Sequence, residues 1–570
     1  MLKNISKLAV GFFICTLVLA VYVQDEQFKH WQVQTHFYPI AQEQDELIAT
    51  INGQQTLVEP LVPFAQSQLS ESSPKDFAYF TPQWVKMPDE KIAYVTASYH
   101  FGIWSLLPAI ATIAICLITR SPLPALLAGI AVGTVMLSQN GLTGGVLIPA
   151  LAQEGAVFLL ILYLWLLGGL LGMWSKTGAA KAFADYMTKT FVKGPRSAKL
   201  VAWTLGIIFF QGGSMSTVLV GTTVRPLADK AKVSHEEMSY IVDSTASPIA
   251  ALIAFNAWPA YIQALIFIPG VTFLATEADR ISFFFSSIPF SFYAILAVVG
   301  TLLLSLNVTM FAGKRIRMAQ QRALTTGELD APGAKPLSTK SLQTVEIPAH
   351  YKAHHLEFVL PLIALVLTAV ATFVLIGTPE VTWAFSAALL VSVVIALSKG
   401  MSFVEVFQGI GAGLKGMIIA SVILILAVVI GGLSQQVGGG LYLISLLGES
   451  LPYWLLPATL QLLTMAIAFS TGTSWGTYAI AFPLAMPLAW AIAQSQGVTN
   501  PEVFMMICFA TVLNGSVYGD QCSPISDTTI LSSMTTGCDL MDHVKSQIFP
   551  ASFAAILAGA LWTLCALWLA

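Results

Sequence analysis

Long apolar runs separated by short polar segments dominate the chain. A helix needs about 20 mostly apolar residues to cross a bilayer, so each uncharged run is long enough to span once and the longest can span twice. Strands of alternating polarity, typical of membrane β-barrels, are absent. The pattern therefore predicts an all-α polytopic membrane protein. The uncharged runs are 121–153, 200–224, 244–276, 281–313, 416–448 and 450–501.

The runs predict roughly a dozen spans in two sets. The first set is expected near 102–119, 122–137, 155–174, 198–211, 239–275 and 284–307. The second is expected near 357–376, 381–397, 414–432, 452–469, 475–492, 502–518 and 547–569. The expected organisation is an N-terminal membrane anchor (1–23), an extracytoplasmic segment (24–100), transport repeat 1 (101–310), a basic cytoplasmic linker (311–355) and transport repeat 2 (356–570).

Composition and charge agree with this organisation. The chain has 27 Lys and Arg and 30 Asp and Glu among 570 residues, far below the ~25% of soluble domains, so a soluble globular fold is excluded. Residues 175–199 and 308–355 are strongly basic and are expected in the cytoplasm, whereas 24–100 is acidic and is expected outside. Lys3 and Lys7 precede an uncharged run without a small-x-small cleavage site, which favours an anchor with a cytoplasmic N-terminus over a signal peptide.

The two sets of spans repeat each other. A motif G-x-S-[MW]-[SG]-T occurs in both sets, a Pro-Leu-Ala follows each copy, and an Asp precedes Ser-Pro-Ile further on. The first set starts after the external segment and ends at the internal linker, where the second set starts, so the repeats must be inverted. Inverted repeats are typical of secondary transporters with a midplane site. The matching segments are 212–217 with 472–477, 226–228 with 487–489, and 243–249 with 520–525.

Three aspartates lie inside these apolar segments: Asp243, Asp520 and Asp527. A charge at the bilayer midplane costs about 2.5–3.5 kcal/mol on insertion scales, so it indicates function. Nearby Gly and Pro free backbone carbonyls, and oxygen ligands suit small hard cations. Desolvation favours a protonated carboxylate, so a proton and a cation compete for one group. The hydroxyls expected beside them are Ser247, Ser523, Ser526 and Thr528.

Weaker interpretations remain open for several polar residues. Asp243 and Asp527 have the chemistry of helix caps, and Pro524 argues against stacking Asp520 and Asp527 on one helix face. The charged residues of 225–237 are interpreted as a solvated loop, although Arg225 could reach inward to an anion. Asn256 and Trp258 either pack in the core or line the transport path. The histidines His350, His354 and His355 form either an interfacial cluster or a pH sensor. The cysteines show no disulfide or metal-binding pattern.

The segments 243–258, 469–477 and 519–533, together with 104–108, resemble the NhaC-type sodium/proton antiporter family, and the resemblance covers about 101–570. It implies a bacterial inner-membrane exchanger of the ion transporter superfamily, often a homodimer, with paired re-entrant hairpins and unwound binding helices. Segment 24–100 departs from the compact family pattern. The implied hairpin-tip and path residues are Gly212, Gly213, Ser214, Ser216, Thr217, Thr471, Gly472, Thr473, Ser474, Thr477, Asn256 and Asn514.

The sequence thus predicts a sodium/proton antiporter that exchanges cytoplasmic Na⁺ for H⁺ by alternating access, with no enzymatic activity, no cofactor and no nucleic-acid partner. Its expected partners are the lipid bilayer, the transported cation and a second copy of the chain. The alternative is cation-coupled exchange of small organic anions or amino acids. An intramembrane aspartyl protease is disfavoured because Val517 breaks a G-x-G-D motif at Asp520. A channel is disfavoured because inverted repeats favour alternating access.

Overall fold

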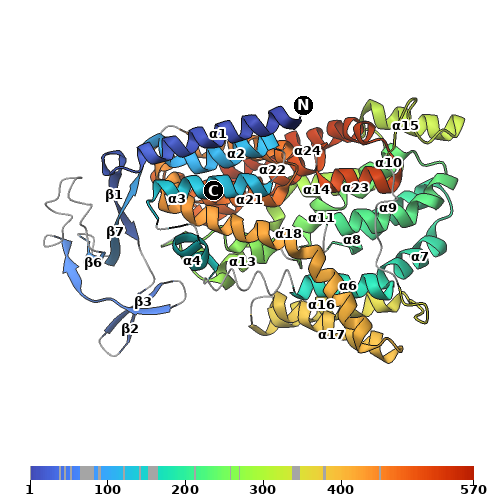
Figure 1. Cartoon of the computed structure of the whole chain (residues 1–570), viewed down its shortest axis with the longest axis horizontal. Helices are drawn as coiled ribbons and strands as arrows, with labels where there is room; N and C mark the ends of the chain where they lie inside the picture. Colours follow the sequence, from blue (N-terminus) through green and yellow to red (C-terminus); the bar gives the residue numbers. More distant parts are fainter. Residues whose placement is uncertain are drawn as a thin grey trace.

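The computed structural model is an elongated helical body with strands at one end (Figure 1). Helix α1 (Leu2–Val23) packs on α2 (Leu107–Thr119) and α3 (Pro122–Met136). The structure describes the whole chain except residues 1, 37–39, 44–45, 52–53, 65–81, 88–91, 120–121, 140, 142, 152–164, 211–212, 254, 257, 269, 337–346, 377–379, 448–450 and 525.

A small β module follows α1. One sheet has the strand order β1-β7-β6-β5, in which only β5 and β6 pair in parallel, and β2, β3 and β4 form a separate antiparallel sheet. Ala93 and Val95 of β7 are buried, as expected because alternate side chains of a strand share one face. The strands are β1 (His30–His36), β2 (Ile40–Glu43), β3 (Glu46–Ile51), β4 (Gln54–Leu57), β5 (Leu61–Pro63), β6 (Gln83–Lys86) and β7 (Ile92–His100).

The remaining described helices form the body. Those before the linker are α4 (Ile148–Leu151), α6 (Gly168–Thr177), α7 (Ala179–Phe191), α8 (Pro195–Ile208), α9 (Gly213–Lys230), α10 (His235–Ser244), α11 (Ser247–Leu252), α12 (Trp258–Gln263), α13 (Glu277–Ser287) and α14 (Phe292–Ser305). Those from the linker onward are α15 (Gly313–Thr326), α16 (Leu356–Ile376), α17 (Val381–Ser398), α18 (Phe403–Gln436), α19 (Gly439–Leu447), α20 (Leu456–Thr471), α21 (Ser474–Ser495), α22 (Pro501–Cys522), α23 (Asp527–Thr536) and α24 (Leu540–Trp568).

Six helices within the described ranges are long and apolar enough to cross a membrane, or seven if the bent pair α13–α14 counts as one span. The bend in that pair is 50°. The prediction of a multi-pass membrane protein is confirmed and the body is helical, while the expected number of about a dozen spans stays a prediction. The all-α prediction is wrong for the segment after α1, whose strands form two sheets. The six are α16, α17, α21, α22, α24 and the segment Tyr453–Thr471 that contains α20.

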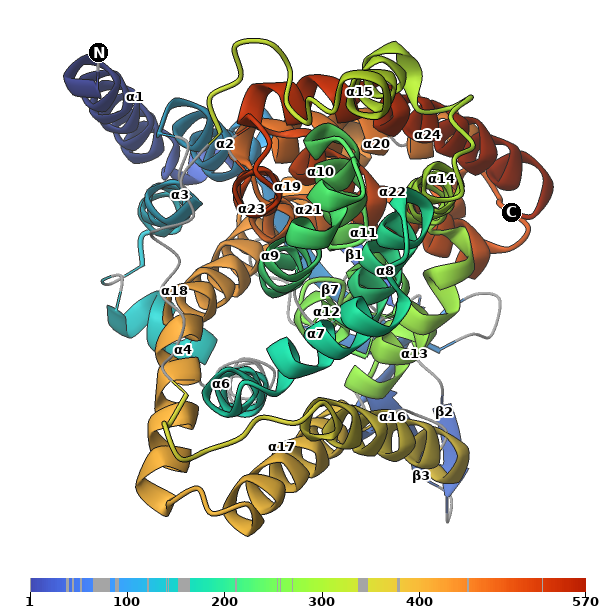
Figure 2. The ribbon, with the colours of Figure 1, turned by 90° about the vertical axis from the view of Figure 1, so that its right-hand side faces the viewer.

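Two helices are broken where the aspartate motifs lie. Helix α10 ends at Ser244 and α11 begins at Ser247, while α22 ends at Cys522 and α23 begins at Asp527. Pro248 is the second residue of α11, just after the first break, and Pro524 lies inside the second break. Each proline favours a break because it lacks an N–H donor and disfavours helical geometry in the residue before it. Helix α10 packs against α23, and α11 packs against α22. The two broken helices therefore lie against each other, as the end view shows for α10 and α23 (Figure 2).

The prediction of a solvated loop is wrong for most of its residues. Arg225, Asp229 and Lys230 belong to helix α9, although their side chains reach solvent. His235, Glu236 and Glu237 begin α10 and are buried. Tertiary contacts explain the burial, because buried charges are tolerated when they are paired: His235 Nδ1 lies 2.7 Å from Asp330 of the linker. The carboxylates of Glu236 and Glu237 bind Arg322 of α15 and Lys199 of α8, at 2.9 and 3.0 Å.

Candidate functional site

Asp520 lies in the last turn of α22 with 4% of its surface exposed. Ser526 Oγ donates a 2.6 Å hydrogen bond to Oδ1, and Ser247 Oγ donates one of 3.5 Å to Oδ2. These two hydroxyls come from the break before α23 and the first residue of α11. Ser474, the first residue of α21, lies near the carboxylate. A single carboxylate therefore joins both broken helices beside the second predicted hairpin.

The first predicted hairpin reaches the same place. A Cβ atom added to Gly213, at the start of α9, would lie 3.0 Å from Thr528 Cγ2 and 3.4 Å from Ser247 Oγ. Ser526 Oγ lies 3.0 Å from Thr528 Oγ1, which extends the hydroxyl cluster along α23. The absence of a side chain at Gly213 thus allows the backbone of α9 to approach both breaks. Gly212 and the side chain of Ser214 fall outside the described residues.

Asp527 occupies a different environment from Asp520. It is the first residue of α23 and is exposed, and its charge acts on Asp520. The break between α22 and α23 prevents the two carboxylates from stacking on one helix face, as Pro524 indicated. A carboxylate in the first turn is favoured by the positive end of the helix dipole. Ser523, at the end of α22, is buried.

Asp243 is not a helix cap. It lies in the last turn of α10, and Ala246 is the N-cap residue of α11, so the cap interpretation is wrong for this residue. Instead, Asp243 Oδ2 lies 3.0 Å from Nε2 of His543, in the first turn of α24. The side chains are 1% and 0% exposed. Sequence reasoning missed His543, whose only signal is a histidine beside an apolar helix.

Gln521 connects the two aspartate regions. Its side chain donates a 2.7 Å hydrogen bond to Ser244 Oγ and accepts a 2.7 Å hydrogen bond from the Tyr293 hydroxyl. Its backbone carbonyl accepts from Gln547 Nε2 at 2.6 Å and from Thr529 Oγ1 at 2.8 Å. Every bond joins different elements or the two sides of a break, so Gln521 holds α10, α14, α23 and α24 around the end of α22. The sequence motif contained this residue, but not its partners.

The two asparagines assigned to the path bond to backbone groups. Asn256 Nδ2 donates to two carbonyls at the end of α11, at 2.9 and 3.0 Å, and its oxygen accepts from the Trp258 amide. Asn514 donates to the carbonyl of Ala510 and accepts from the amide of Ala294, at 2.8 and 2.9 Å. Both arrangements position backbone: Asn256 orders the turn into α12, and Asn514 ties α22 to α14.

The remaining hairpin residues shape the helix ends. Gly472 ends α20 with a left-handed φ of 67°, a conformation that glycine adopts without steric cost. Thr477 Oγ1 donates a 2.9 Å hydrogen bond to the Thr473 carbonyl. Thr471 Oγ1 lies within hydrogen-bonding distance of the same carbonyl. On α9, the Thr217 carbonyl accepts from Thr535 at 3.1 Å. Ser216 Oγ is buried without a partner among the described residues.

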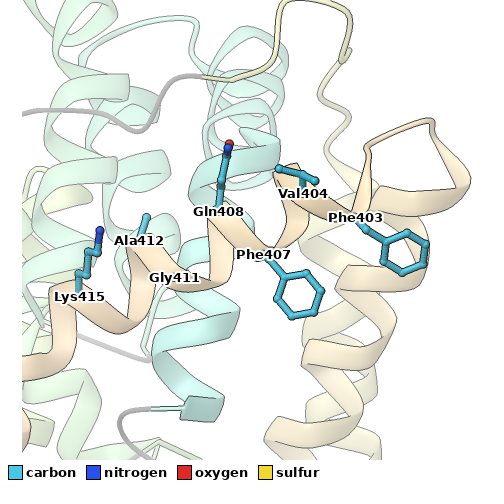
Figure 3. A pocket seen from close by; sticks show the side chains of 7 residues that line it. All are labelled: Phe403, Val404, Phe407, Gln408, Gly411, Ala412 and Lys415. Carbon is cyan, nitrogen blue, oxygen red and sulfur yellow. The ribbon is translucent and has the colours of Figure 1, made fainter.

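A groove of about 590 Å³ lies elsewhere, along α18. Figure 3 shows Phe403 and Phe407 on one side of the helix and Gln408 and Lys415 on the other. The groove contains none of the site residues. The candidate site is therefore the buried hydroxyl cluster around Asp520, whose carboxylate and neutral oxygens match the ligand preference of small hard cations.

Comparison with known proteins places this geometry in context. Residues 256–566 match the sequence model of the Na⁺/H⁺ antiporter family. An uncharacterized protein of Haemophilus influenzae is 32% identical over 482 residues, covering 81% of this chain and 90% of that protein. The malate-2H(+)/Na(+)-lactate antiporter of Bacillus subtilis is 32% identical over 111 residues, 19% of this chain and 22% of that protein. The YdaH transporter of Alcanivorax borkumensis superposes with a TM-score of 0.44 at 12% identity, covering 74% of this chain and 87% of that one.

Proposed function

Since the chain belongs to the Na⁺/H⁺ antiporter family and is a secondary transporter rather than an enzyme, we propose that it exchanges cytoplasmic Na⁺ for H⁺. The single observation that carries the proposal is the buried Asp520 carboxylate, which accepts hydrogen bonds from Ser526 and Ser247. A buried carboxylate must be neutralised, either by a proton or by a cation. Sodium and a proton then compete for Asp520, and that competition couples their movement.

The hydroxyl cluster supplies the remaining oxygen ligands for Na⁺. In this proposal, Ser526, Thr528 and Ser247 turn their oxygens to the cation when Asp520 loses its proton, and exposed Asp527 attracts the cation to the entrance. The two inverted repeats provide alternating access around this site. The broken helices α10–α11 and α22–α23 support that arrangement, because their breaks meet at Asp520.

The cellular context of the proposal has two sources. The family resemblance implies a homodimer in the bacterial cytoplasmic membrane. The charge distribution favours a cytoplasmic N-terminus and basic linker (311–355), with the β module outside. The transport repeats are 101–310 and 356–570. In this orientation, an inward proton gradient drives Na⁺ out of the cell.

The test is Na⁺-driven proton efflux from proteoliposomes, followed with a pH-sensitive dye. Wild type should release protons on addition of Na⁺, whereas Asp520→Asn should lose the response because an amide cannot exchange a proton for a cation. Asp527→Asn should weaken it. The control Asp185→Asn changes a carboxylate of α7 outside the site and should respond as wild type does. Equal responses from Asp520→Asn and wild type would refute the assignment.

A second candidate is exchange of a small organic anion coupled to Na⁺ or H⁺. It is favoured by the similarity, over 111 residues, to an antiporter named for malate and lactate. The anion would be held by hydroxyls and helix-end amides at the hairpins. Under this alternative, Na⁺ alone produces no proton flux, and uptake of a labelled dicarboxylate or amino acid requires both solutes. The same proteoliposomes distinguish the two candidates.

A further inference from the structure

The pair Asp243–His543 is a second buried ionisable site that the proposed cation site does not use. The two side chains are in contact at 3.0 Å and almost completely buried. They come from helices that are 300 residues apart in sequence. Asp243 lies at the carboxyl end of α10, where the helix dipole disfavours a negative charge. A bare carboxylate is therefore unfavourable there, and an imidazolium or a proton beside it is favourable.

The pair also has unused bonding capacity. Oδ1 of Asp243 and Nδ1 of His543 are buried and have no hydrogen-bond partner in the described part of the chain. Buried polar atoms are nearly always paired, so two orphaned atoms in one contact require an explanation. One explanation is that the pair gains and loses a proton during the transport cycle. The protonated and deprotonated pairs then need different hydrogen-bond partners.

The charged groups near Asp243 indicate that the His543 imidazole is the group of this site that accepts a proton. The titratable groups whose charges interact with that of Asp243 are Tyr240, Tyr293, Cys522 and Asp520. Two basic groups packed against the linker end of α10 are already bound: Lys199 to Glu237 and Arg322 to Glu236. His543 thus provides the cationic partner in contact with Asp243.

Hydrogen bonds of Gln521 link the end of α22 to the residues that flank the pair. Gln521, next to Asp520, donates to Ser244, next to Asp243. The carbonyl of Gln521 accepts from Gln547, one helical turn after His543. A movement of the end of α22 when Asp520 binds or releases a cation therefore changes the contacts on both sides of the pair.

We propose that Asp243 and His543 form a proton-binding site separate from the cation site at Asp520. This inference rests on the proposed function and adds a second proton to it: besides the proton that competes with Na⁺ at Asp520, the pair must bind a proton before the sodium-free transporter can return. The pair binds one proton, passing from carboxylate and neutral imidazole to carboxylate and imidazolium, so its charge changes from −1 to 0. Gln521 links this change to the state of Asp520.

The test compares two transport modes in proteoliposomes. Exchange of ²²Na⁺ for unlabelled Na⁺ requires only the cation site, whereas Na⁺-driven proton efflux also requires the proton site. His543→Gln and Asp243→Asn should keep Na⁺/Na⁺ exchange and lose proton efflux to the level of protein-free liposomes. Asp520→Asn should lose both modes. His350→Gln, which changes a surface histidine, should resemble wild type.

Each outcome separates the inference from the proposed function. If wild type shows neither mode, the proposed function fails. If wild type shows both and His543→Gln retains proton efflux, the separate proton site is refuted, and loss of both modes in a folded His543→Gln refutes it equally. Should a single variant fail to fold, the double variant Asp243→Asn with His543→Gln provides a neutral, hydrogen-bonded pair. It should show Na⁺/Na⁺ exchange without proton efflux, and the opposite result would overturn the inference.

Discussion

At the scale of single residues, the site depends on hydroxyls that serve one carboxylate. Ser526 makes the shortest bond to Asp520, 2.6 Å, and also contacts Thr528. Ser532, within α23, is equally buried, but its Oγ has no partner among the described residues. The N-cap serine of α23 and a serine inside the helix therefore share burial and differ in their partners, which provides a matched pair for mutation.

Ser526→Ala should weaken Na⁺ binding while Ser532→Ala should not. A hydrogen bond to a charged group contributes about 1.5–3 kcal/mol, so loss of the Ser526 hydroxyl should raise the KM for Na⁺ by roughly tenfold or more. The measurement is proton efflux against Na⁺ concentration in proteoliposomes. An unchanged KM in Ser526→Ala would show that this hydroxyl is not a ligand or an organiser of the site.

His235, at the linker end of α10 and outside the candidate spans, should make stability depend on pH. Burial lowers its pKa, but bonds to Asp229 and Asp330 and their charges outweigh burial and raise the pKa to about 9. A raised histidine pKa stabilises the fold fully below the ordinary value of 6.5, and the contribution is lost as pH rises through about 9. Thermal unfolding of wild type and His235→Gln should therefore differ at pH 6 and converge above pH 9. A difference that stays constant with pH would contradict this account.

At the scale of elements, glycines allow a close crossing of two helices. Helix α6 crosses α18 at Gly168 and Gly172 on one side and Gly409 and Gly413 on the other, so each helix carries a small-xxx-small pattern. Without side chains, the backbones can approach closely, which stabilises helix pairs in membranes by van der Waals packing. A Cβ atom on Gly413 would lie 2.8 Å from Gly172 Cα. The crossing has no space for a methyl group.

Gly413→Ala should destabilise the protein and Gly416→Ala should not. Overpacking costs about 1–3 kcal/mol, whereas a Cβ atom on Gly416, on the same helix, meets nothing within 4 Å. Alanine is also the better helix former by about 0.5–1 kcal/mol, so Gly416→Ala should be neutral or slightly stabilising. Thermal unfolding in detergent measures both. Equal unfolding temperatures for the two variants would show that the crossing is not closely packed in the protein.

At the scale of the whole molecule, the β module contacts the helical body at the end of β7. His100 is buried there, with its ring 5.3 Å from that of His30 and 5.8 Å from that of Tyr442 in α19. The Gly102 amide donates to His100 Nδ1 at 3.0 Å, so the bonded nitrogen must be unprotonated. The junction therefore favours neutral His100.

Acid should loosen this junction. Burial, and next the charge of His30, lower the pKa of His100 below its ordinary value of 6.5. Because the pKa of His100 is lower in the docked junction than in the unfolded chain, neutral His100 stabilises the junction fully above pH 6.5. This contribution declines as the pH falls below 6.5. The protection of β7 amides, taken relative to their intrinsic exchange rates, should therefore fall between pH 7 and pH 5. His100→Gln should remove this pH dependence, and an equal loss of protection in the variant would assign it to another group.

Much of the molecule was predictable because the signals were local. Apolar runs indicated α16, α17, α21 and α22, since helical spans depend on the hydrophobicity of about 20 consecutive residues. Pro524 indicated a broken helix because proline acts on its own neighbours. The sequence also predicted serines and threonines around Asp520, and in the structure Ser526 bonds to Asp520 and Thr528 bonds to Ser526.

Other features depended on which distant elements meet. The bond between Ser247 and Asp520 joins positions 273 residues apart, and the pair Asp243–His543 joins positions 300 apart. The burial of His235 requires the linker to fold back on α10, so the charged sequence alone indicated solvent. By itself, the sequence determined the helices, their breaks and the chemistry carried at the breaks. Only the tertiary structure decided which charges are paired, because a charge is stabilised or left exposed by the partners that packing brings within a few ångströms.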